Sequence, residues 1–147
     1  MRNDFKATAD TLNLGFVYGR KDFLNLMEDA ETDKTYLYAE PPRTTPIRSG
    51  TGVTTGETVV GKFMLLKKGN MDAKYDEEQN AEGVTVEAKY QDIIEPMKTT
   101  LESVINNLED ICNDGGYEIT YNYIEIINVL DITMDGLLIN YTAIKNN

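Results

Sequence analysis

The stretch that decides the fold runs from Glu87 to Ile144 and includes YQDIIEPMKTTLESVINNLEDIC at residues 90–112. Its apolar residues recur at steps of three and four, which is the spacing of an α-helix with one buried face. The NDGG tetrapeptide at 113–116 suits the end of such a helix, because asparagine and glycine tolerate a left-handed C-cap. From Tyr117 the residues become β-branched and aromatic, so the sequence predicts a long helix followed by a β-hairpin.

Two details of this stretch need an interpretation. Pro96 lacks a backbone donor, so either the helix kinks there or its regular part begins near Glu95; the apolar stripe continues on both sides, which favours a kink. In the hairpin, the apolar residues move from odd to even positions, which predicts a β-bulge or a strong twist near residues 123–125. The turn is expected over 131–136, with Asp135-Gly136 as its strongest signal.

The rest of the chain adds short elements to this framework. A short helix is expected over 4–14, and strands over 35–39 and 58–68; residues 15–19 turn or form a brief strand, and 21–30 fit a helical turn or a strand. A chain of 147 residues suits a single domain, 1–147. The predicted fold is α+β, an antiparallel or mixed sheet of about four strands, with a long helix in the C-terminal half and a short N-terminal helix packed on one face.

Two polar segments are expected to project from this domain. Residues 41–57 are rich in threonine, proline and glycine and predict an exposed loop or a projecting hairpin; they lack the lysine of a phosphate-binding loop. This segment is either a flexible surface loop or an arm that orders against a neighbouring subunit. Residues 69–83 are acidic, but Ala73, Lys74 and Tyr75 break the ligand spacing of a calcium-binding loop, which favours a solvated loop.

Charge and composition exclude several classes of function. The net charge is −11 and the basic residues are scattered, so a surface that grips nucleic acid or an acidic membrane is disfavoured, although an acidic wall can let DNA slide past. There is no apolar run long enough for a membrane span, and the start lacks the layout of a secretory signal. We therefore expect a soluble, unprocessed protein.

The chain is also poor in the residues that carry chemistry. It has no histidine, and its one cysteine, Cys112, falls on the apolar helical face, where a buried thiol is expected. Neither a zinc site nor a cofactor site is predicted. Carboxylate pairs such as Asp131 with Asp135 are typical of turns, so we predict no catalytic residues and no enzyme. An enzyme that uses only carboxylates for catalysis is the least favoured of three functional hypotheses.

Several segments together resemble a known group of proteins. GFVYGRKDFLNLM at 15–27, the TYLYAEPP strand that follows, IIEPMK at 93–98 and NVLDITMDGLLINYTAI at 128–144 resemble small virion proteins of Bacteroidetes bacteriophages, including crAss-like phages, that are similar to tail terminators. The resemblance implies an α+β subunit that forms a ring in the neck or tail, between portal and tail tube. Residues 41–57 are longer than the usual pattern, which leaves the position of the ring open.

The functional prediction combines this resemblance with the residues themselves. The predicted function is that of a structural virion protein, assembled in the host cytoplasm, that forms a homo-oligomeric ring. The ring is expected to contact portal, adaptor or tail proteins and to let DNA pass as cargo. The residues expected at subunit or ring contacts are Arg43, Thr44, Ile47, Arg48, Tyr75, Tyr121, Tyr123 and Ile126, and the solvated acidic residues facing the lumen are Asp76, Glu77 and Glu78. The alternative is a small acidic binding module, such as a dimeric regulator or an inhibitor that mimics nucleic acid.

Overall fold

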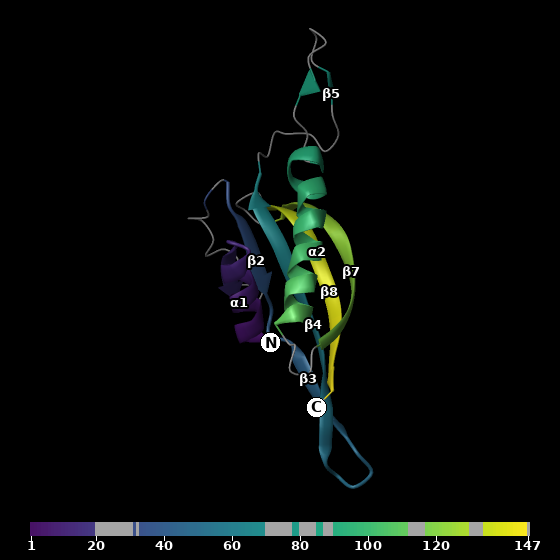
Figure 1. The fold of residues 1–147 in the computed structure, drawn as a ribbon. Helices are drawn as coiled ribbons and strands as arrows, with labels where there is room; N and C mark the ends of the chain where they lie inside the picture. Colours follow the sequence, from purple (N-terminus) through teal and green to yellow (C-terminus); the bar gives the residue numbers. More distant parts are fainter. Residues whose placement is uncertain are drawn as a thin grey trace.

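The computed structural model describes residues 1–19, 31, 33–69, 78–79, 85–86, 90–111, 117–129 and 134–146. These residues form an elongated α+β fold in which two helices cover one face of a twisted sheet (Figure 1). In chain order the elements are α1 (Arg2–Thr11), β1 (Gly15–Tyr18), β2 (Thr35–Ala39), β3 (Arg43–Arg48), β4 (Thr54–Lys68), β5 (Glu78–Gln79), β6 (Thr85–Val86), the π-helical turn η2 (Tyr90–Ile94), α2 (Glu95–Asp110), β7 (Tyr117–Val129) and β8 (Met134–Asn146).

The main sheet is built around the long strand β4. The strand order is β1-β2-β4-β8-β7, and β3 also pairs with β4, which makes six strands. Strands β2 and β3 pair with successive stretches of the same edge of β4, at Ala39 opposite Phe63 and at Arg43 opposite Val60. Only the β1–β2 pair is parallel among these strands. Strands β5 and β6 form a separate two-stranded sheet.

The main core lies between the helices and one face of this sheet. Helix α2 buries a stripe of apolar residues at helical spacing, and α1 adds Phe5 and Ala9. On the sheet side, Phe63 and Leu65 of β4 meet this layer, because alternate residues of a strand point to the same face. Burial of this apolar surface is the main source of stability.

The opposite face of the sheet is divided into an apolar and a polar half. A second buried cluster holds Tyr38, Met64, Leu66 and Met134. Farther along the same strands, this face carries Lys62, Thr120, Asn122 and Asn140 instead. The polar half of this face is formed where β4, β8 and β7 run side by side, with Asn140 between Lys62 and Asn122.

The predicted four-stranded sheet with a long C-terminal helix is wrong. The structure has a six-stranded sheet, and its regular helix α2 spans only 16 residues. Strand β3 was not counted in the predicted sheet, because RTTPIR contains almost no apolar residues; it lies in the segment 41–57, predicted as an exposed loop or a projecting hairpin. Pro96 lies in the first turn of α2, where its missing N–H is not needed. The regular helix therefore begins at Glu95, directly after a π-helical turn. Of the two interpretations of Pro96, the favoured kink is wrong and the start near Glu95 is confirmed.

The elements also differ in detail from the predicted ones. Helix α1 begins and ends earlier than the predicted 4–14, and Asn13 after it has a positive φ of 54°. The irregular register in the β7–β8 hairpin falls between Ile126 and Val129, not over 123–125. Asp135 and Gly136 are not in a turn but within β8, opposite Lys67 and Leu66 of β4.

Some predictions fall outside the described residues. These are the segment 21–30, the C-cap at 113–116, Cys112, Tyr75, Asp76, Glu77 and Asp131. Glu78 belongs to β5.

Tyr141 gives a first testable prediction about the core. Its ring packs against Phe5 and Phe63, and its buried hydroxyl has no hydrogen-bond partner within the part of the chain that the structure describes. Its Oη lies over Gly61, where an added Cβ would stand 2.7 Å from it. Because a buried hydroxyl without a partner is costly, we expect Tyr141→Phe to raise the free energy of unfolding by about 1 kcal/mol.

The same substitution should change the response to alkaline pH. Burial, followed by the charges of Tyr18 and Tyr117, raises the pKa of Tyr141 above its ordinary value of 10.0. Because the pKa of this phenol is higher in the folded chain than in the unfolded chain, its ionisation favours unfolding. The free energy of unfolding is therefore unaffected by this group below pH 10 and falls as the pH rises further. Urea unfolding from pH 8 to about pH 11 should therefore show a steeper loss in the wild type than in Tyr141→Phe. Equal slopes would contradict this assignment.

Candidate assembly surfaces

The predicted contact residues that the structure describes lie on two strands of the same sheet. Arg43, Thr44 and Arg48 are exposed and Ile47 is half-buried on β3; Tyr121 and Tyr123 are exposed and Ile126 is half-buried on β7. Strands β4 and β8 separate β3 from β7. Each group is therefore gathered on its own strand, but the two groups do not meet within one chain.

Strand β7 is a long edge of the sheet. It pairs with β8 on one side, and no other described strand pairs with it. It spans 13 residues, contains no proline or lysine, and leaves Tyr121, Tyr123 and Ile124 exposed by 39%, 41% and 55%. Proteins usually protect such an edge with lysine, proline or a very short strand, because its free N–H and C=O groups can pair with another chain.

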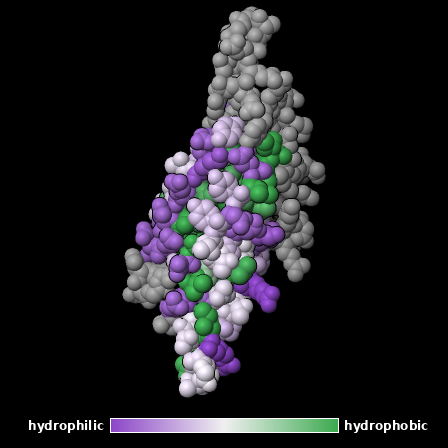
Figure 2. Space-filling view, turned by 90° about the vertical axis from the view of Figure 1, so that its right-hand side faces the viewer, coloured by the Kyte–Doolittle hydropathy of each residue, from purple (hydrophilic) through white to green (hydrophobic). Residues whose placement is uncertain are grey.

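The surface on this side agrees with that description. Figure 2 views the molecule from the side on which β7 lies in Figure 1, and hydrophobic residues reach the surface there between hydrophilic ones. Among the described residues, Glu109 accepts a hydrogen bond from the N–H of Ile119 on this edge, while Tyr121, Tyr123 and Ile124 stay exposed along it.

The β3 side of the sheet has the opposite character. Strand β3 has six residues, follows Pro41 and Pro42, and contains Pro46, which has no N–H to donate. Its two ends carry Arg43 and Arg48. This side is therefore short and basic and contains a proline, whereas β7 is long and acidic and contains none.

The β3–β4 connection forms an ordered arm. Figure 1 shows this hairpin extending beyond the body of the sheet. Its turn is held by hydrogen bonds: the N–H of Ser49 donates to the carbonyl of Val53 (2.8 Å), and the N–H of Gly52 donates to the carbonyl of Ser49 (2.9 Å). Gly52 has a φ of +81°, a conformation that glycine adopts without strain. Two forms were predicted for the segment 41–57, an exposed loop and a projecting hairpin, and the structure shows the hairpin.

A cluster around Lys98 joins the start of α2 to β7. The ammonium group lies 3.1 Å from the Glu125 carboxylate and donates to the Tyr90 hydroxyl at 3.1 Å. These two hydrogen bonds, with Tyr90 the larger cause, raise the pKa of Lys98. Glu125 is thus engaged within its own chain, whereas Glu118, also on β7, is exposed and has no ion pair with any described residue.

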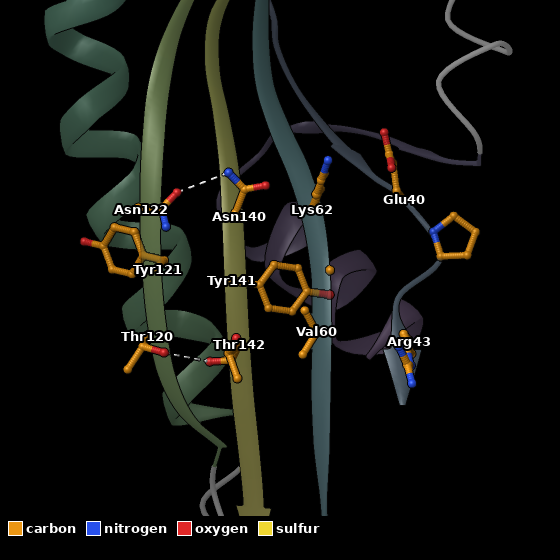
Figure 3. Close-up of a pocket in the computed structure, with 12 residues that line it drawn as sticks. Glu40, Arg43, Val60, Lys62, Thr120, Tyr121, Asn122, Asn140, Tyr141 and Thr142 are labelled. Carbon is orange, nitrogen blue, oxygen red and sulfur yellow. Dashed lines mark hydrogen bonds between the residues drawn. The ribbon is translucent and has the colours of Figure 1, made fainter. Parts of the chain in front are cut away.

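A shallow groove crosses the polar half of the open face. Figure 3 shows its lining on β4, β7 and β8 and on the chain between β2 and β3, with a volume of about 480 Å³. Asn140 donates to Asn122 at 3.1 Å, and Thr120 donates to the carbonyl of Thr142 at 3.4 Å. The lining residues are Glu40, Pro41, Arg43, Val60, Gly61, Lys62, Thr120, Tyr121, Asn122, Asn140, Tyr141 and Thr142.

The chemistry of this groove suits a polar contact. Its donors and acceptors are spread along two cross-strand rows, with Asn122 opposite Asn140 and Asn140 opposite Lys62 in one of them. They do not converge on one point, as a small-molecule site would require. These residues were not predicted from the sequence. Asn122 lies opposite Asn140, and Thr120 lies opposite Thr142, which can be known only from the β7–β8 register.

Two features of the described residues bear on metal binding and on membrane insertion. Within those residues, no three of His, Cys, Asp and Glu gather in a way that could hold a metal ion. No helix there is long and apolar enough to cross a membrane.

Comparison with known proteins adds no relative. No protein family matches this chain, and no curated protein matches it. The features that bear on function are therefore the two edges of the sheet and the projecting hairpin, together with the resemblance of several segments to phage virion proteins.

Proposed function

We propose that this protein is a structural subunit that assembles with copies of itself into a ring in the neck or tail of a bacteriophage virion. The observation that carries the proposal is the outer edge of β7, 13 residues long, with Tyr121, Tyr123 and Ile124 exposed. An edge of this length and composition pairs readily with another chain.

The two sides of the sheet favour a ring over a symmetric pair. A contact between two different surfaces repeats from copy to copy and closes into a ring if the rotation allows, whereas a contact between identical surfaces ends at a dimer. Here the β3 side and the β7 side differ in length, charge and proline content. A head-to-tail contact would also unite the two groups of predicted contact residues, which one chain keeps apart.

The resemblance to phage virion proteins supplies the setting. A ring between portal or adaptor and tail surrounds the DNA, and a protein of net charge −11 would let a polyanion pass without holding it. Helix α2 adds an acidic exposed side, with Glu95, Glu102 and Asp110. Residues 76–78 remain predicted to face the lumen.

Blocking the β7 edge tests this proposal. We expect the wild-type protein to form large, uniform particles as its concentration rises, and Tyr123→Lys with Ile124→Lys to weaken association by about tenfold or more, because buried lysines oppose an edge contact. Light scattering across a concentration series, with negative-stain images of the large species, measures both. Thr99→Lys with Asn106→Lys adds the same charge to exposed positions of α2 and serves as the matched control.

The outcomes separate the hypotheses. A wild-type protein that stays monomeric at every concentration contradicts self-assembly. A wild-type dimer whose association is unchanged by Tyr123→Lys with Ile124→Lys contradicts assembly through the β7 edge, and favours the small binding module. Closed rings that dissociate in the β7 variant and persist in the α2 variant support the proposal.

A further inference from the structure

We infer that the β3–β4 hairpin of one copy docks on the β7 edge of the next copy, with Arg43 and Arg48 of the hairpin attracted to the acidic edge that carries Glu118. This inference rests on the proposed function, because it names the two surfaces that meet in the ring. It assigns the hairpin one role, as the arm that reaches the neighbouring subunit.

Charge is the first argument. Strand β3 contains two arginines and no carboxylate, while β7 contains Glu118 and Glu125 and no basic residue. Arg43 and Arg48 are exposed and form no ion pair with any residue that the structure describes. Copies that each carry −11 repel one another, so a stable contact needs local attraction of this kind.

The acidic side has its own reason to accept a cation. Helix α2 ends with Glu109 and Asp110 and has no basic residue in its last turn, although a helix C-terminus carries partial negative charge. Glu109 accepts a hydrogen bond from the N–H of Ile119 at 3.4 Å, which holds this end of α2 beside the start of β7. Glu118 lies on β7 next to this position and is exposed, so it offers a carboxylate to an arginine of a neighbouring copy.

Apolar surface on the two partners is the second argument. On the hairpin, Val53 and Val60 are exposed by 61% and 48%. On β7, Tyr121, Tyr123 and Ile124 are exposed. Contact between the hairpin and the edge would remove both sets from water, which adds affinity to the charge pairing.

The geometry gives the contact a direction. Strand β3 and strand β7 lie on opposite sides of β4 and β8, so each copy presents its hairpin to one neighbour and its β7 edge to the other. Pro46 prevents β3 from extending the neighbour's sheet as an uninterrupted strand, because it has no N–H. Side chains, chiefly the arginines, therefore determine which part of β7 the hairpin meets.

Charge reversal tests the pairing. Arg43→Glu with Arg48→Glu should weaken association by about tenfold or more, since two attractive contacts become repulsive. Arg2→Glu with Lys6→Glu changes the net charge equally on α1, where both residues are exposed, and should leave association close to that of the wild type. Glu118→Arg alone should also weaken association, and adding it to the hairpin variant should restore a measurable part.

A mixing experiment tests the direction. The Arg43→Ala, Arg48→Ala protein keeps its β7 edge, and the Tyr123→Lys, Ile124→Lys protein keeps its hairpin. Mixed together, they should form a discrete one-to-one complex by light scattering, with neither variant forming rings alone. Dimers of the hairpin variant alone would show that two β7 edges pair with each other, and would overturn the inference.

Failure of the inference differs from failure of the proposed function. Rings that form normally in the Arg43→Glu, Arg48→Glu protein overturn the docking of the hairpin and leave ring formation intact. A wild-type chain that never assembles contradicts ring formation itself. Binding of duplex DNA that the same arginine substitutions abolish, without any change in assembly, would assign the arginines to nucleic acid instead.

Discussion

Replacing Gly136 with alanine is expected to lower the free energy of unfolding by about 3 kcal/mol, at the upper end of the cost of overpacking a core. Gly136 lies in β8, between Leu66 of β4 and Ile126 of β7. A Cβ added there would overlap the backbone carbonyl of Leu65 and stand 3.0 Å from the Met97 sulfur. The carbonyl belongs to the central strand, so it can move away only if the strand pairing changes.

Gly50 provides the matched control for this substitution. It lies in the exposed turn of the β3–β4 hairpin, and a Cβ added there would meet no atom within 4 Å. Gly50→Ala should therefore change the free energy of unfolding by no more than about 0.5 kcal/mol. Urea unfolding at neutral pH measures both variants. Equal stabilities of Gly136→Ala and Gly50→Ala would show that β8 does not approach β4 as closely as described.

Gly136 also shows why some of the fold could not be predicted from the sequence. An Asp-Gly pair between two apolar runs is a strong turn signal, since glycine adopts turn conformations readily. The same glycine is equally suited to a place where a neighbouring backbone comes close. Only the pairing of β8 with β4 decides between these two uses, and that pairing joins residues far apart in the chain.

The elements that could be predicted carry their signal locally. The buried stripe of α2 follows from the spacing of Met97, Leu101, Val104 and Leu108, and β2 has the bounds expected for 35–39. Strand β3 has no such signal, because its residues are exposed and polar, and its partner is the long β4. Strand formation there depends on tertiary pairing, which overrides a weak local preference.

The candidate contact residues divide in the same way. Tyr121 and Tyr123 are among the contact residues predicted from the sequence, and the structure places both on the exposed edge. That they make contacts between subunits stays a prediction. Lys62 and Asn140 of the groove carry no sequence signal of their own, since each is an ordinary polar residue until the sheet places them in one row.

Replacing Phe63 with alanine is the other substitution with a large expected effect. Phe63 is completely buried on β4, and its ring centroid lies 5.3 Å from that of Phe5 on α1 and 5.8 Å from that of Tyr141 on β8. Removing the ring deletes its buried area and leaves a cavity among three elements. We expect the free energy of unfolding to fall by about 3–5 kcal/mol, which for a domain of this size is a large part of the total.

Val60 is the matched control on the same strand. It points to the other face of β4 and is 48% exposed, so Val60→Ala should cost no more than about 0.5 kcal/mol by urea unfolding. Phe5→Ala should be costly by itself, and the Phe5, Phe63 double variant should lose less than the two single losses combined, because both truncations open the same cavity. Strict additivity would instead mean that α1 does not pack on β4 through these two rings.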